Sequence, residues 1–315
     1  MKKIYFAAIS AALLMLAAAC SNEAVEPVDQ ATVQFSVNLD DIQSRTISDG
    51  TTVDQLIFAV YDQDGNELPQ LRQDFEVNER NAQVTTKVAL GQKYTFVFWA
   101  QKQGNTHYNT SNLKDVVVSY EGYANDETRD AFTNVYEVEK VTGPINETVT
   151  LYRPFAQLDY VCDLEEWENL FKSNYELTGC DLTVEGGAYT HLNLLTGEAS
   201  QPTAVEAPFT LLTAGYVTTR VASGTDVSYT EKFVQDNVEK FWISMNYILA
   251  TPQQTMLNSA TMNIYSKISG ESQPIPIKCD NVPIQRNHRT VIYISDLTQV
   301  IKTNITIDPS FGGDF

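Results

Sequence analysis

Apolar and polar residues alternate along most of this chain, in short runs separated by turn residues. The clearest run is Thr32–Leu39, where the two kinds alternate through eight positions and predict a β-strand with one buried face. Similar runs, rich in Val, Thr, Tyr and Phe, predict further strands. They lie at Gln55–Tyr61, Gln83–Leu90, Tyr94–Ala100, Val116–Tyr120, Glu147–Leu151, Ala156–Cys162, Asp181–Glu185, Phe209–Leu212, Lys240–Met245, Ala260–Tyr265, Thr290–Ile294 and Thr303–Ile307.

Helical periodicity is rare. Apolar residues recur at helical spacing over Leu164–Leu177, which predicts one short helix, and Asp126–Phe132 could form another turn or two. Asp64-Gly65 follows the predicted strand at Gln55–Tyr61 and predicts a hairpin turn, because glycine readily adopts the positive φ that such a turn needs. Many short strands separated by frequent turns favour an all-β fold built of sandwiches.

The chain divides most naturally near Leu151-Tyr152, which gives domains at 31–151 and 152–315. The length of 315 residues also suggests two domains. Hydrophobic residues make up 43% of the chain and charged residues 19%, so the chain can bury a core and is not globally disordered. We therefore expect two folded units in tandem.

The charge balance excludes some classes of protein. The chain has 21 Lys and Arg against 40 Asp and Glu, a formal charge of −19. Recognition of phosphates needs a basic surface, so we expect no nucleic-acid partner. The negative charge also argues against electrostatic adhesion to an anionic lipid surface.

The N-terminus has the pattern of a secretory signal. Lys2 and Lys3 precede an apolar, alanine-rich segment that ends at Ala19 and is too short for a comfortable membrane span. Small residues stand directly before Cys20, as in a bacterial lipobox, so we interpret 1–19 as a signal peptide and Cys20 as a lipidated N-terminus. The polar segment 20–30 is then a tether. The alternative is a plain secretory signal in which Cys20 is incidental.

The remaining chemistry-bearing residues form no recognisable catalytic set. Cys162 and Cys180 could pair in an oxidising envelope, and the alternative is that these residues and Cys279 are small buried side chains. No spacing of Cys and His suggests a metal site. Hydrolase, phosphate-loop and dinucleotide motifs are missing from the sequence, so we expect neither an enzyme nor a cofactor.

A polar segment from Asp40 to Gly50 follows the first predicted strand and contains one basic residue, Arg45. It has the composition of an exposed loop, which is where proteases cut. Taken alone, Arg45 is best interpreted as an ordinary surface arginine. The inward side of the strand before it is formed by Val33, Phe35, Val37 and Leu39.

The order of these segments resembles the fimbrillins of Bacteroidales: a lipoprotein signal, a short tether, one alternating strand, and an Arg-containing loop before the next strand. Four later segments are also similar to that family, whereas Ile294–Thr298 departs from its pattern. The similar segments are Val53–Asp62, Leu151–Leu158, Val282–Thr290 and Ile305–Phe311.

The resemblance implies two tandem transthyretin-like β-sandwiches with one or two short helices, exported as a lipoprotein to the outer membrane and cell surface. It implies that a trypsin-like protease cuts between Arg45 and Thr46 and so removes the first strand. Loss of Val33, Phe35, Val37 and Leu39 would leave a groove for a strand of a neighbouring subunit. The implied partners are other fimbrial subunits, the protease and the outer membrane, with a receptor on a host or bacterial surface as a further candidate.

Two alternatives to a polymerising fimbrial subunit stay open. An uncleaved anchor or accessory lipoprotein would keep Cys20 and its own first strand. A glycan-binding surface lipoprotein would instead stack sugars on exposed aromatic residues, of which the chain offers 16 Tyr, 14 Phe and 3 Trp.

Overall fold

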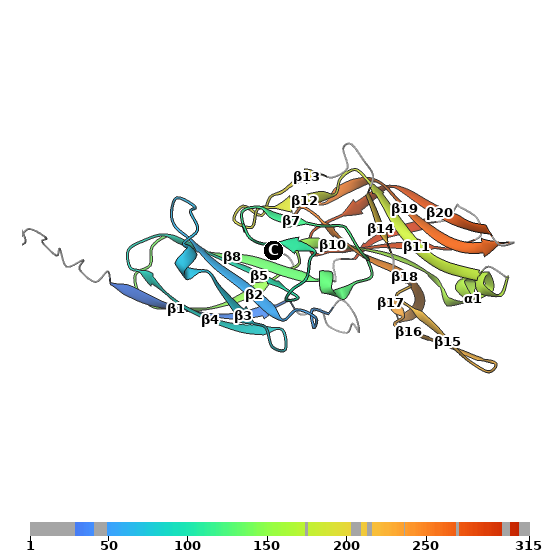
Figure 1. Cartoon of the computed structure of the whole chain (residues 1–315), viewed down its shortest axis with the longest axis horizontal. Coiled ribbons are helices and arrows are strands. Elements are labelled where there is room, and N and C mark those ends of the chain that lie inside the picture. Colours follow the sequence, from blue (N-terminus) through green and yellow to red (C-terminus); the bar gives the residue numbers. More distant parts are fainter. Residues whose placement is uncertain are drawn as a thin grey trace, which may run out of the picture.

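The computed structural model describes residues 29–40, 49–173, 176–202, 209–212, 216–235, 237–268, 271–297 and 303–308. Within these ranges the chain forms twenty-two strands, one α-helix and two short 3-10 helices. The predicted all-β sandwich fold is therefore confirmed. Figure 1 shows an elongated molecule, with the N-terminal strands towards one end and the C-terminal strands towards the other.

The N-terminal part is a sandwich of two sheets, with strand orders β4-β1-β9 and β3-β2-β5-β8. Every second residue of β1 and β4 is buried, because the apolar sides of these strands face a core shared with β2, β5 and β8. The strands are β1 (Gln30–Leu39), β2 (Gln55–Tyr61), β3 (Gln73–Glu76), β4 (Asn81–Ala89), β5 (Tyr94–Gln101), β8 (Ala131–Val138) and β9 (Ile145–Leu151).

The C-terminal part has sheets with strand orders β17-β18-β10-β21-β22 and β14-β11-β19-β20. Its first strand, β10, runs antiparallel to β18 and parallel to β21, just as β1 runs antiparallel to β4 and parallel to β9. The strands are β10 (Phe155–Asp163), β11 (Glu176–Glu185), β14 (Phe209–Leu212), β17 (Phe233–Gln235), β18 (Val238–Leu249), β19 (Thr255–Ile268), β20 (Glu271–Ile284), β21 (Arg289–Ile294) and β22 (Thr303–Asp308).

A smaller sheet joins the two parts, with the order β13-β12-β7-β6. It pairs β7 from the N-terminal part with β12 from the C-terminal part, and His191 lies opposite Val117. One hydrophobic core extends across this junction, from Ile57 and Trp99 into the C-terminal sheets. The division of the chain at 151/152 stays a prediction. The bounds are β6 (Tyr108–Asn109), β7 (Val116–Val118), β12 (Tyr189–Leu192) and β13 (Ala199–Pro202).

The α-helix, α1 (Leu164–Lys172), is shorter than predicted. Its buried Trp167 stacks on Phe241, with ring centroids 3.8 Å apart. The prediction of helix as far as Leu177 is wrong, because β11 begins at Glu176 and pairs Leu177 with Ser266 of β19. In the ranges that the structure describes, no helix has the length and apolar character needed to cross a membrane.

Each predicted strand is found, most with small shifts at the ends, whereas β11, β18 and β19 are five to eight residues longer than predicted. The hairpin turn is also confirmed: the Gly65 N–H donates to the Asp62 carbonyl at 3.0 Å, and Gly65 has a φ of +74°. Of the 126–132 segment, Glu127–Arg129 forms a 3-10 helix and the end enters β8. The longest strand that the pattern missed is β20, which contains three prolines. It lies at the edge of its sheet, where proline is tolerated because one side of the backbone has no partner strand.

Candidate functional site

The first strand lies in the middle of its sheet. Phe35 is opposite Val84 of β4 on one side and opposite Glu147 of β9 on the other. The inward side chains of Val33, Phe35 and Val37 are at most 1% exposed, and Leu39 is 5% exposed. Without β1, the facing edges of β4 and β9 would expose unpaired backbone N–H and C=O groups. Thus β1 supplies both part of the core and the hydrogen bonds that join its neighbours.

Phe35 fills an aromatic pocket formed by the opposite sheet. Its ring centroid lies 5.1 Å from that of Phe96 and 5.2 Å from those of Phe98 and Tyr136. Phe58 lies further away, at 6.3 Å. The three nearer rings meet Phe35 edge to face, a geometry that contributes about 0.5–1.5 kcal/mol per pair beyond simple burial. This pocket makes Phe35 the best-anchored side chain of β1.

The C-terminal end of β1 leads to Asp40, which is held by residues far away in the sequence. The Asp40 N–H donates to the Leu151 carbonyl at 2.9 Å, and the Arg80 guanidinium donates to the Asp40 carbonyl. The Asn287 amide donates to the Asp40 carboxylate at 3.4 Å and accepts from the Arg153 N–H at 3.3 Å. Asn287 is buried with a φ of +56°, a left-handed conformation that Asn adopts more readily than most residues. The strand therefore ends in contact with both parts of the molecule.

A buried ion pair lies beside this end. The Nε and Nη2 atoms of Arg153 donate to the two carboxylate oxygens of Asp130 at 2.6 and 2.5 Å, and neither side chain is more than 1% exposed. The guanidinium carbon is 4.2 Å from the centre of the Phe132 ring. Burial raises the pKa of Asp130, and the charge of Arg153 opposes that rise. Loss of either partner would leave a buried, uncompensated charge, which costs about 3–5 kcal/mol.

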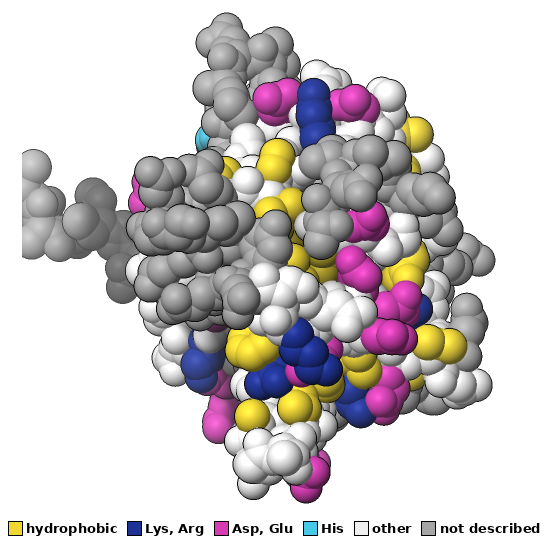
Figure 2. Space-filling view, turned by 90° about the vertical axis from the view of Figure 1, so that its right-hand side faces the viewer, with side chains coloured by type: hydrophobic (Ala, Val, Ile, Leu, Met, Phe, Trp, Pro, Cys, Tyr) yellow, Lys and Arg dark blue, Asp and Glu magenta, His cyan; other side chains and the backbone are white. Residues whose placement is uncertain are grey.

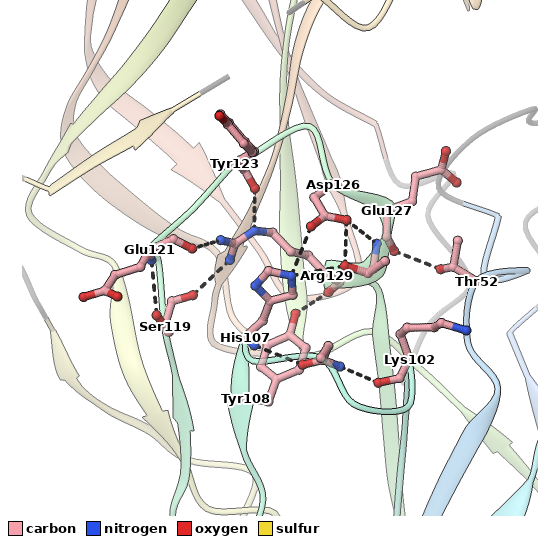
Figure 3. A network of polar contacts seen from close by, with 12 residues as sticks. Thr52, Lys102, His107, Tyr108, Ser119, Glu121, Tyr123, Asp126, Glu127 and Arg129 are labelled. Atoms are coloured by element: carbon pink, nitrogen blue, oxygen red, sulfur yellow. Dashed lines mark hydrogen bonds and ion pairs between the residues drawn. The ribbon is translucent and has the colours of Figure 1, made fainter. Parts of the chain in front are cut away.

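A second polar network holds the loop at 119–123 (Figure 3). The Nε atom of Arg129 donates to the Tyr123 carbonyl at 2.7 Å, and Nη1 donates to the Ser119 carbonyl at 2.9 Å. The remaining nitrogen, Nη2, donates to the Glu121 carbonyl. All three guanidinium nitrogens of Arg129 therefore have backbone acceptors, and the network fixes the path of the loop.

His107 belongs to the same network. Its Nε2 atom lies 3.2 Å from the Asp126 carboxylate and 3.1 Å from the Thr128 hydroxyl, which itself donates to Asp126. Burial is the main cause that lowers the pKa of His107. Because both neighbours also bond each other, we interpret His107 as part of a loop-fixing cluster rather than as a catalytic base.

Figure 2 shows the end of the molecule that carries α1 and the hairpin of β15 (Thr219–Ser223) and β16 (Asp226–Thr230), where apolar and charged side chains are interspersed. Arg220 fastens the hairpin to α1, because its Nε and Nη2 atoms donate to Glu168 at 2.8 and 2.9 Å. The Tyr229 hydroxyl donates to Glu168 at 2.6 Å. The bonds from Arg220, and then that from Tyr229, lower the pKa of Glu168 to about 2.

The other site predictions have mixed outcomes. Cys20, Arg45 and Thr46 lie outside the described residues, so lipidation and processing stay predictions. Cys162 and Cys180 are buried thiols on strands of two different sheets, so the disulfide that the sequence left open is not found. Burial raises the pKa of the Cys162 thiol, which favours a packing role. Among the described residues, no group of three or more His, Cys, Asp or Glu could hold a metal ion.

Comparison with known proteins gives one family. Residues 25–315 match the model of a family described as a family of unknown function, DUF6562. No curated protein matches the chain significantly.

The chain is also similar to several solved structures. A fimbrial assembly protein from Parabacteroides distasonis has 13% identity and a TM-score of 0.41, with 89% of this chain and 100% of that chain covered. A protein described provisionally as an adhesin from Bacteroides ovatus has 12% identity and a TM-score of 0.49, with 88% and 94% covered. A structure from Bacteroides thetaiotaomicron, described provisionally as that of polysaccharide-binding proteins, has 14% identity and a TM-score of 0.47, with 88% of this chain and 96% of that chain covered.

Proposed function

The chain belongs to the family of unknown function DUF6562, and we propose that it is a structural subunit of a cell-surface fimbria with a role in adhesion. In this proposal the protein is exported as a lipoprotein and attached to the outer membrane through Cys20. A trypsin-like protease then cuts between Arg45 and Thr46. The first strand leaves with its lipid, and a strand from another subunit takes its place.

The position of β1 is the observation that carries this proposal. It is the first strand of the described chain, and yet it is the central strand of its sheet. Its side chains close one face of the N-terminal core, and its backbone joins β4 to β9. A cut between Arg45 and Thr46 would fall between β1 and β2 along the chain and would separate β1 from all the strands that follow it.

The energetics favour replacement over simple loss. Burial of Val33, Phe35, Val37 and Leu39 stabilises the fold by about 1.5–3 kcal/mol for each side chain. Departure of β1 would expose the apolar core and two unpaired strand edges, so the vacated groove would be a strong binding site for another strand. The incoming strand would need apolar side chains at alternate positions, with a large group in the place of Phe35.

Limited proteolysis tests this function. The mature lipoprotein in detergent is treated with a low dose of trypsin, the products are identified by mass spectrometry, and their size is followed by light scattering. We expect the first cut after Arg45, followed by loss of the N-terminal peptide and growth of oligomers. The variant Arg45→Gln should stay intact and monomeric. The control Lys114→Gln, which removes an exposed basic side chain from another loop, should behave as the unchanged protein.

Two results would contradict the proposal. A protein that is cut after Arg45 but keeps its first strand bound and stays monomeric would show that β1 does not exchange. A protein that trypsin first cuts elsewhere, with Arg45 protected, would support the alternative of an uncleaved anchor lipoprotein that keeps Cys20 and β1.

A further inference from the structure

A small pocket lies at the junction of the two parts. It has a volume of about 230 Å³ and is lined by residues of β8, by Tyr152, by the segment 192–197 and by Arg286. This is somewhat smaller than the roughly 300–1,000 Å³ of pockets that bind drug-sized ligands. The volume therefore suits a ligand of about the size of one sugar ring.

Arg286 gives this pocket its charge. The residue is 6% exposed, and no acidic residue is among those that line the pocket. Its Nε donates to the Ala250 carbonyl at 3.1 Å and its Nη2 to the Gly197 carbonyl at 2.8 Å. Among the residues that the structure describes, Nη1 has no hydrogen-bond acceptor. A buried guanidinium with an unused nitrogen at a pocket is a suitable donor for an anion.

Comparison with the other buried arginines shows what is unusual here. Arg153 pairs with the carboxylate of Asp130, and Arg289 pairs with that of Asp159. Arg129 uses all three of its nitrogens on backbone carbonyls. Among the residues that the structure describes, Arg286 pairs with no carboxylate and donates to only two backbone carbonyls. Burial lowers its pKa to about 10, so it stays protonated at neutral pH. A ligand carboxylate would supply the missing counter-charge.

The rest of the lining is uncharged. Leu192 and Leu194 are apolar, and Thr196 and Tyr152 are polar members of the lining. The Thr196 hydroxyl donates to the Glu198 carboxylate at 3.4 Å and accepts from the Glu198 N–H at 3.3 Å. A lining that combines apolar and polar uncharged residues suits a ring with an apolar face and polar substituents, as a sugar has. We propose that this pocket binds an acidic sugar, a hexuronic acid residue whose carboxylate pairs with Nη1 of Arg286. Such a site would give the protein a glycan ligand in addition to its proposed role in a fimbria.

Titration calorimetry of the intact protein with three probes tests this assignment. Glucuronate carries both the ring and the carboxylate, glucose carries the ring alone, and acetate carries the carboxylate alone. We expect saturable binding of glucuronate, with glucose and acetate at least tenfold weaker. Acetate that binds as tightly as glucuronate would overturn the sugar assignment, and no binding of glucuronate would overturn the site.

Two variants then locate the binding. Arg286→Lys keeps the charge but has fewer donors, so we expect at least a tenfold loss of glucuronate affinity. Because Arg286 also holds two backbone carbonyls, this variant could fail to fold, and Leu195→Trp provides the second test by filling the pocket with no change at Arg286. The matched control is Leu68→Trp, at a partly buried leucine of the N-terminal core. Glucuronate binding that survives Leu195→Trp in a folded protein would contradict the proposal.

Discussion

The side-chain amide of Asn287 donates to the carboxylate of Asp40 over 3.4 Å, joining positions that are 247 residues apart in the sequence. Asp40 directly follows β1, whereas Asn287 lies in the turn before β21. The same amide also accepts from the backbone of Arg153, beside the buried pair that Arg153 makes with Asp130. Removal of β1 would thus take away a contact at the junction as well as part of the N-terminal core.

Truncation of Phe35 tests how strongly β1 is anchored. We expect Phe35→Ala to lower the free energy of unfolding by about 3–5 kcal/mol, because it removes a buried ring and leaves a cavity among four aromatic side chains. The neighbouring exposed residue gives the control, since Gln34→Ala should change stability by no more than about 0.5 kcal/mol. Urea denaturation measures the free energy of unfolding of each variant. Equal losses in the two variants would argue against the aromatic pocket as an anchor.

The contact between Asp40 and Asn287 can be removed without backbone strain. Glycine tolerates the φ of +56° found at Asn287, so Asn287→Gly deletes the amide and keeps the turn. We expect a loss of about 1–3 kcal/mol and faster hydrogen exchange at the end of β1. Asn281→Gly is the matched control, because Asn281 has a φ of +55° but is exposed. If both variants change exchange in β1 equally, the contact has no specific role.

The three buried cysteines should be unreactive in the folded protein. Cys162, Cys180 and Cys279 are buried, and burial raises the pKa of the Cys162 thiol, which disfavours the reactive thiolate. We therefore expect no labelling of these residues by an aromatic disulfide reagent in native buffer and full labelling in denaturant. Peptide mapping by mass spectrometry identifies the labelled sites. A bridge between Cys162 and Cys180 in such a map would contradict the structure.

Acid should loosen the hairpin of β15 and β16. Hydrogen bonds from Arg220, followed by that from Tyr229, lower the pKa of Glu168 from an ordinary 4.5 to about 2. A carboxylate with a lowered pKa in the folded state adds stability above its unfolded pKa, and this contribution is lost as pH falls from about 4.5 towards 2. The protection of residues 219–230 against hydrogen exchange, corrected for the intrinsic pH dependence of exchange, should fall over this range in the unchanged protein. In Glu168→Gln, exchange should be fast already at neutral pH and respond less to acid.

The local pattern was enough to predict most strands, and it failed where distant contacts decide the structure. β1 was predictable because its alternation reflects one buried face. The end of α1 was not predictable, because the pairing of Leu177 with β19 overrides the helical periodicity of the sequence. β20 was missed because its prolines are compatible with a strand only at a sheet edge, a position that the chain reveals only when folded.

The candidate site was predictable only in part. The apolar side of β1 follows from the alternation, whereas the contacts at its end depend on pairs such as Asp40 with Asn287 that share no local pattern. The pocket at Arg286 was missed for the same reason, because its lining comes from four separate regions of the chain. Arg153 and Asn287 both lie in segments that resemble fimbrillins, which is the one signal that could have drawn attention to them.

The most direct test of the central claim is the N-terminal residue of the protein in surface polymers collected from intact cells. Mass spectrometry distinguishes two forms, one that begins at Thr46 and one that begins at an acylated Cys20. If β1 is replaced by a strand of a neighbouring subunit, the polymerised protein begins at Thr46 and the 20–45 peptide is absent from it. Polymers whose subunits begin at acylated Cys20 and keep β1 would contradict the account.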